Sequence, residues 1–149
     1  MKKLQTVFAA TMLLFATSAF AASGPEKVSP KVKAEFEKSF TKALNVSWEK
    51  SNDIYFANFQ LDAKEVSAAY NETGELLGVS RIIATTQLPL NISMAVANKY
   101  AGYTVDKTAT EMTYEGQTSY YVTVENDKQV LKLKCSATGE IGVERKNKK

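Results

Sequence analysis

Two stretches of this chain share one alternation of apolar and polar side chains, and they lie 65 residues apart, as the positions of Gly74 and Gly139 show. Apolar side chains occupy every second position of residues 55–61 and 66–70, and again of residues 120–124 and 131–135. Strict alternation predicts β-strands with one buried face. Each stretch continues into a turn that contains glycine, which tolerates positive φ. We therefore expect two antiparallel meanders built on an internal repeat.

A helix is predicted before each meander. Ser29 and Pro30 have the residue types of an N-cap and a first helical position, and Pro89 opens the second helix. Apolar residues follow at helical spacing in both segments: Val32, Phe36 and Phe40, then Ile92, Val96 and Tyr100. The expected fold class is α+β, with two tandem helix-plus-four-strand repeats (residues 29–84 and 85–149) forming an antiparallel sheet with the helices packed on one face.

Residues 1–21 have the features of a secretory signal peptide. Lys2 and Lys3 precede an apolar run at residues 7–15, and Ala19-Phe20-Ala21 offers small residues for cleavage. The alternative is a transmembrane anchor, for which the run is short. We expect cleavage after Ala21, a flexible segment at residues 22–28, and a periplasmic or secreted protein. No cysteine follows the run, so a lipoprotein is not expected, nor is membrane insertion after cleavage.

The charge of the chain argues against a polyanionic ligand. The formal net charge is +3, and it falls to +1 when Lys2 and Lys3 are removed with the leader. So small a charge predicts no nucleic acid partner. The single cysteine, Cys135, could be a redox or intermolecular thiol. Because it shares a strand face with Leu131 and Leu133, we favour a buried apolar role.

The sequence contains no histidine, and thus lacks the commonest general base and metal ligand. It also lacks a Cys-x-x-Cys pair, a glycine-rich phosphate loop and a calcium loop. We expect no catalytic residue, no cofactor and no metal site. An enzyme with a lysine base acting on serine or threonine is the alternative that the residues leave open.

Three large side chains point away from the expected helix side of the sheet. Ile54 and Phe56 alternate with Tyr55 and Phe59, and Tyr121 has the same place in the second stretch. If helices cover one face only, these three side chains are exposed and could contact a partner. The simpler interpretation is that they serve strand propensity.

Spaced aromatic, proline and glycine positions in both halves form a pattern that spans nearly all of the chain after the leader. In the first half the positions are Pro30, Val32, Phe36, Val46, Trp48, Glu49, Tyr55, Ala57, Phe59, Ala69, Tyr70, Gly74, Glu75 and Leu76; in the second they are Leu88, Pro89, Lys99, Tyr100, Gly102 and Tyr103. This pattern resembles the PepSY-like family of exported bacterial proteins, which is described as β-lactamase-inhibitor-like. The resemblance implies helices on one face of an antiparallel sheet, a concave opposite face, and inhibition or regulation of a peptidase. No inhibitor contact residue can be matched.

We therefore expect an exported, non-catalytic binding protein of the cell envelope with a protein partner. It could inhibit or regulate a peptidase or related enzyme through the open face of the sheet. The alternative is a binder of a small apolar ligand or cell-wall fragment in the sheet concavity. The sequence identifies neither the partner nor the oligomeric state, and it does not show whether both repeats share one sheet.

Overall fold

The computed structural model describes residues 28–149, so the predicted signal peptide and its cleavage site lie outside the described residues. The described residues divide into two compact units, the first ending at Leu77 and the second running from Gly78 to Lys149, and each is described by itself. The described residues form two α-helices and one short 3-10 helix: α2 (Pro30–Ser39), η2 (Thr85–Gln87) and α3 (Leu90–Lys99). The strands are β1 (Leu44–Ser51), β2 (Ile54–Leu61), β3 (Lys64–Asn71), β4 (Leu76–Ala84), β5 (Thr104–Tyr114), β6 (Gln117–Glu125), β7 (Gln129–Ser136) and β8 (Ile141–Lys148).

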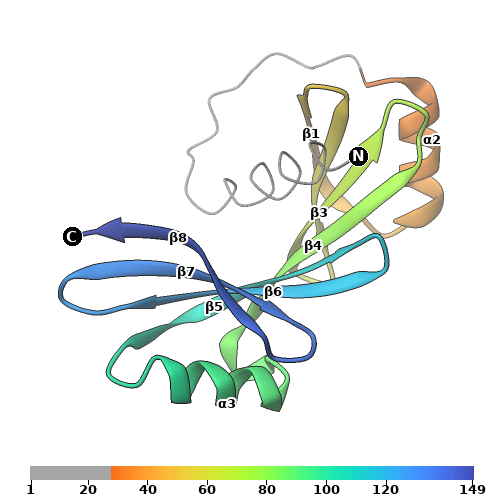
Figure 1. Cartoon of the computed structure of the whole chain (residues 1–149). Coiled ribbons are helices and arrows are strands. Elements are labelled where there is room, and N and C mark those ends of the chain that lie inside the picture. Colours follow the sequence, from red (N-terminus) through yellow and green to blue (C-terminus); the bar gives the residue numbers. More distant parts are fainter. Residues whose placement is uncertain (1–27) are drawn as a thin grey trace. The chain divides into compact units, whose positions relative to one another are not determined.

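The strands follow one another in a single antiparallel sheet, in the order β1 to β8 (Figure 1). The expected α+β class, in which two tandem helix-plus-four-strand repeats form a sheet with helices packed on one face, is wrong, because the structure is mostly one sheet: strands make up 57% of the described structure and helices only 19%. Each α-helix has 10 residues and only two buried side chains, Val32 and Phe36 in α2 and Ile92 and Val96 in α3. The helices are short covers on a structure that consists mainly of sheet.

In the first unit, α2 packs through Phe36 onto one face of the strands. The helix begins where Ser29 Oγ accepts a hydrogen bond from Val32 N at 3.3 Å and Pro30 takes the first turn. The ring of Phe36 lies 5.2 Å from that of Trp48 and 5.1 Å from that of Phe59, between centroids, with edge-on geometry in both pairs. Such aromatic contacts add to the burial energy of the rings.

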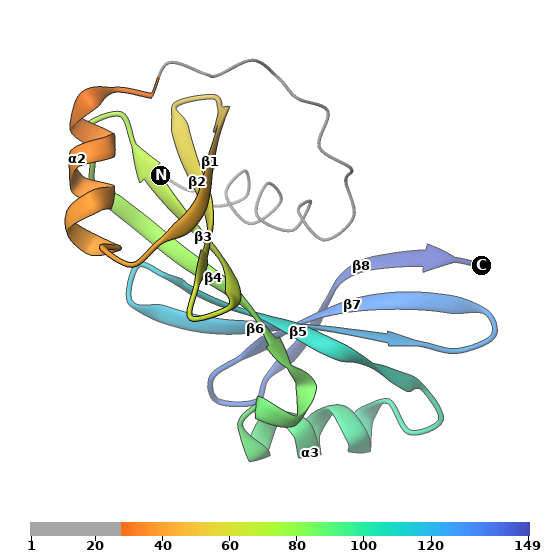
Figure 2. The ribbon, with the colours of Figure 1, turned by 180° about the vertical axis from the view of Figure 1, so that it is seen from behind.

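In the second unit, α3 covers one face of β5, β6 and β7 (Figure 2). The core beneath it contains these buried residues: Ile83, Leu88, Ile92, Val96, Ala109, Val122, Val124, Leu131, Leu133 and Cys135. Cys135 is fully buried, which confirms the expectation, and burial raises the pKa of its thiol. Asn91 Nδ2 donates to the carbonyl of Ala137 at 3.0 Å, so the turn after β7 is held against the start of α3.

Equivalent hairpin turns close the two meanders. Asn71 Oδ1 accepts from Glu75 N at 2.9 Å, and Ser136 Oγ accepts from Glu140 N at 3.1 Å. In both turns glycine takes a positive φ, +83° at Gly74 and +93° at Gly139, which favours a residue without a β-carbon. The turn residues noted in the sequence therefore have the conformations that their types predict.

Two local features shape the helix and strand ends. The first helix ends at Ser39, because Phe40 leaves the helical backbone region. Strand β5 is irregular near its start, since its pairing with β6 shifts register between Val105 and Ala109. Such irregularities bend a strand locally.

Candidate functional site

The described residues form neither a cluster that could hold a metal ion nor a helix that could span a membrane. Across residues 28–149, no group of three or more Cys, Asp or Glu residues is arranged to hold a metal ion. Within the same residues, no helix is both long enough and apolar enough to span a membrane. The candidate site is formed by the surfaces of the sheet.

Strand register places Ile54 and Phe56 on the sheet face away from α2. Phe56 pairs with Ala69, whereas the neighbouring pair of Tyr55 and Tyr70 lies on the α2 side. The expected exposure is wrong for both residues, since Ile54 is 5% and Phe56 1% exposed. Alternation predicted the side of the sheet to which they belong but not the burial of that side.

Two polar side chains share this face with Phe56. Asn58 and Ser67 are paired residues on β2 and β3. Asn58 Nδ2 and Ser67 Oγ are buried and have no hydrogen-bond partner in the structure. A buried polar atom without a partner costs about 1–3 kcal/mol, so such atoms require an explanation.

Tyr121 occupies the equivalent place in the second unit. It lies between Tyr120 and Val122, which contact the α3-side core, so its side chain is on the opposite face. Its exposed fraction is 2%, and here too the expected exposure is wrong. The hydroxyl is buried without a hydrogen-bond partner, and burial, helped by the charge of Glu144, raises the pKa of Tyr121 to about 12.

Charged side chains lie over and beside Tyr121. Lys134, its neighbour across β6 and β7, is exposed and places Nζ 5.9 Å from the centre of the Tyr121 ring. This distance is within the range of a cation–π contact. Lys132 is on the same face of β7 and pairs with Arg145 of β8. Sequence reasoning missed this charged group, because the pairing of β7 with β8 brings its members together.

A second surface feature lies on the α2 side of the first unit. A recess of about 510 Å³ is lined by the aromatic residues Phe36, Phe40 and Trp48, with Val46 beside them and Lys33 and Glu37 among the polar residues. Trp48 is only partly buried, so it is not the fully enclosed anchor that a lone tryptophan on a strand suggests. The recess has a mixed lining of aromatic and polar side chains and lies within the usual size range of small-molecule sites.

Comparison with known proteins gives a fold but no family. No family model matches the chain, and no curated protein matches it. A solved structure of a Bacteroides eggerthii protein with an inferred periplasmic location is 17% identical, covers 81% of this chain and 88% of that chain, and has a TM-score of 0.71. A DUF2874 family protein from Bacteroides uniformis is 19% identical, with 80% and 88% covered and a TM-score of 0.70.

A third similar structure is that of a BLIP-like protein from Bacteroides fragilis. It is 22% identical, covers 86% of this chain and 89% of that chain, and has a TM-score of 0.67. None of the comparisons shows the PepSY-like family that the motifs resemble. At these identities the likeness establishes the fold alone, and the fold of this chain is BLIP-like.

Proposed function

We propose that the chain is an exported, non-catalytic protein of the cell envelope that binds another protein through strand faces that lie away from the helix of their own unit. The partner would be a peptidase or related enzyme that it inhibits or regulates. The leader-like sequence at residues 1–21 supports export. The BLIP-like fold supports binding only by analogy, since one fold can serve many functions.

The observation that carries the proposal is a set of buried polar atoms on these faces. Asn58 Nδ2, Ser67 Oγ and the hydroxyl of Tyr121 have no hydrogen-bond partner in the structure. All three lie on strand faces away from the helix of their own unit. A protein partner supplies backbone carbonyl and amide groups that can pair with such atoms.

Because Ile54, Phe56 and Tyr121 are buried, the first two side chains and the Tyr121 ring do not form the surface that a partner contacts. Ile54, Phe56 and the ring of Tyr121 underlie these faces and stabilise them, and the contacts with the partner come from the unpartnered polar atoms and from exposed residues around them. In the second unit Lys134 is such a residue, because it is exposed and lies over the Tyr121 ring. The proposed binding face is thus a buried aromatic layer with polar residues at its surface.

Site-specific crosslinking tests this proposal. A photoreactive residue replaces Lys134 in one variant and Met94, which is 56% exposed on α3, in a control variant. In the exported fraction, position 134 should crosslink to one protein and position 94 should not. The partner is then purified, and its activity is measured with and without this chain. Equal crosslinking at both positions, or none at position 134, would contradict the proposal.

A second candidate function is favoured by the recess beneath α2. Its size and aromatic lining suit a small apolar ligand, although it lies on the α2 side and not on the open face. Trp48 is the only tryptophan in the chain, so its fluorescence reports directly on the recess. Quenching by an apolar dye that is lost in a Phe40→Ala variant would support this function. A dye signal that is unchanged in the variant would exclude the recess as its binding site.

A further inference from the structure

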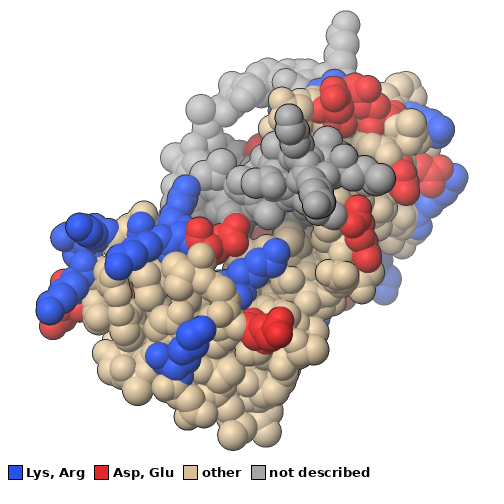
Figure 3. All heavy atoms as spheres, in the orientation of Figure 1, with Lys and Arg blue, Asp and Glu red and all other residues tan. Residues whose placement is uncertain are grey.

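A group of cationic side chains gathers on the sheet face away from α3. Lys132 and Lys134 are two residues apart on β7, and Arg145 pairs with Lys132 from β8. The pairing shifts register at this point, which leaves Glu144 as an extra residue beside Arg145. In Figure 3, Lys and Arg side chains gather over the part of the molecule where β7 and β8 lie. With Glu144 included, the group has three positive charges and one negative charge.

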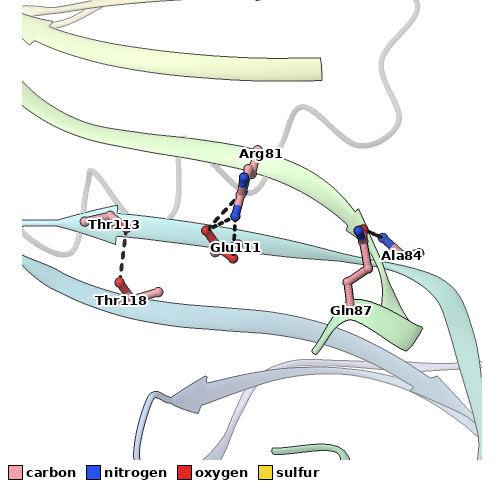
Figure 4. A network of polar contacts seen from close by, with 6 residues as sticks. All are labelled: Arg81, Ala84, Gln87, Glu111, Thr113 and Thr118. Atoms are coloured by element: carbon pink, nitrogen blue, oxygen red, sulfur yellow. Dashed lines mark hydrogen bonds and ion pairs between the residues drawn. The ribbon is translucent and has the colours of Figure 1, made fainter. Parts of the chain in front are cut away.

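The ion pair formed by another arginine of the same unit contrasts with the surroundings of Lys134 and Arg145. Arg81 of β4 donates to both carboxylate oxygens of Glu111 on β5, at 3.0 and 3.2 Å (Figure 4). Two hydrogen bonds of this kind satisfy a guanidinium well. Among the ion pairs formed by residues 28–149, none includes Lys134 or Arg145.

The arrangement of Lys132 and Arg145 is electrostatically unfavourable. Like charges directly opposite each other on paired strands destabilise a sheet. Burial lowers the pKa of Lys132, and the charge of Arg145 lowers it further, whereas Glu144 acts in the opposite direction. An anionic group bound between these side chains would relieve the repulsion. The nearby hydroxyl of Tyr121, buried and unpartnered, could donate a hydrogen bond to the same group.

We infer that Lys132, Lys134 and Arg145 form a subsite for an acidic segment of the protein partner, with carboxylates as the recognised groups. The inference rests on the proposed function and specifies the chemistry of the partner. Charge complementarity identifies the occupant, because three cationic groups gather beside a single carboxylate. Complementary charges raise association rates and specificity in protein complexes.

A protein fits this surface better than a membrane or a nucleic acid. Polybasic sequences that bind anionic lipid contain roughly 4–8 Lys or Arg residues, and here Glu144 offsets one of only three cationic groups. The aromatic residue of the group, Tyr121, is buried and cannot insert into a lipid headgroup layer. A nucleic acid site would require a broader basic stripe.

The test uses a short glutamate-rich peptide as the probe and a matching glutamine-rich peptide as its control. The mature chain is labelled for NMR and titrated with each peptide at low salt. The glutamate peptide should shift the amide signals of Lys132, Lys134 and Arg145, and the Tyr121 ring signals with them. Replacing all three cationic residues with glutamine should weaken binding about tenfold or more.

A matched variant separates this subsite from general attraction to positive charge. Lys128→Gln, Lys146→Gln and Lys148→Gln remove the same charge from exposed positions of the same unit, and Lys146 and Lys148 alternate with Arg145 along β8. This variant should bind the glutamate peptide as the parent does. Lys132→Arg with Lys134→Arg should retain binding, and circular dichroism should show that every variant is folded.

Three results would overturn the inference: no binding of the glutamate peptide, equal losses in the two glutamine variants, or equal binding of both peptides. A parallel assay with phosphatidylglycerol vesicles identifies the other occupant. Vesicle binding that requires Lys132, Lys134 and Arg145, without peptide binding, would assign the group to lipid. If crosslinking from position 134 still recovers a protein partner in that case, the acidic subsite is wrong but the proposed function stands.

Discussion

Each meander has a side that faces the helix of its unit and an opposite side, which we call the open side. The two units resemble each other more closely on the helix-facing side than on the open side. On the helix-facing side, positions 65 residues apart are apolar in both units, as Val66 and Leu131 or Ala68 and Leu133 show. Every one of these four side chains is buried. The need to cover a short helix with apolar surface therefore sets the composition of this side in both units.

The open side follows no such rule. Ser67 and Ala69 in the first unit correspond to Lys132 and Lys134 in the second, at the same spacing of 65 residues. Phe56 and Tyr121 keep an aromatic residue on β2 and β6. The aromatic layer is thus common to both units, whereas the cationic group is restricted to the second. We therefore expect the residues that determine binding specificity to lie in the second unit.

The largest expected effect comes from the aromatic layer that the two units share. Phe56→Ala and Tyr121→Ala should each lower the free energy of unfolding by about 3–5 kcal/mol, because both side chains are buried. Urea denaturation of each variant measures the loss. If one of the two substitutions lowered the free energy of unfolding by less than about 1 kcal/mol, the aromatic residue would stabilise the fold in the other unit alone. The two units would then not share this feature.

The Tyr121 hydroxyl should make stability sensitive to alkali. Its pKa is raised to about 12, so the folded chain holds this proton more tightly than the unfolded chain does. The contribution is present below the unfolded pKa of about 10 and is lost as the pH rises through about 12. Urea midpoints measured across this range should fall by less in Tyr121→Phe than in the parent. An identical fall in both proteins would contradict this account.

Cys135, on the helix-facing side, should behave as a core residue. Burial raises the pKa of its thiol, which keeps the thiol protonated and slow to react. A thiol reagent should label the native chain far more slowly than the urea-unfolded chain, and Cys135→Ser should cost about 1–3 kcal/mol. Rapid labelling of the native chain would show that the core of the second unit opens easily.

The smallest expected effect on stability comes from the cationic group that is present in the second unit only. Lys132→Gln should raise the free energy of unfolding by about 0.2–1 kcal/mol, because it removes a like charge opposite Arg145. The matched change Lys146→Gln should have no such effect. Denaturation at low and high salt measures both, and the gain should shrink as salt screens the repulsion. A loss of stability in Lys132→Gln would show that Lys132 stabilises the folded sheet.

The strands could be predicted from the sequence because alternation reports directly on strand geometry. From this alternation we predicted where the hairpins lie, that Cys135 is buried, and on which side of the sheet Phe56 and Tyr121 lie. Alternation could not predict that their side was buried, because it distinguishes two faces without showing what covers either one. The small share of helix could not be predicted, since a few apolar residues at helical spacing do not fix helix length.

The cationic group could not be predicted for a different reason. Lys132 and Arg145 are brought together by the register of β7 with β8, and that register shifts at Glu144. A shift of one residue moves side chains to the other face. Because no rule of composition or spacing locates this shift, the pairing of the two charges is visible only in the structure.

The central claim is that the open face of the second unit binds the partner. The most direct test compares Lys134→Glu with Lys146→Glu, which reverse one charge each on β7 and on β8, in a binding assay with the purified crosslinked partner. The account predicts binding at least about tenfold weaker for Lys134→Glu and parent-like binding for Lys146→Glu. Equal affinities for the two variants would contradict it.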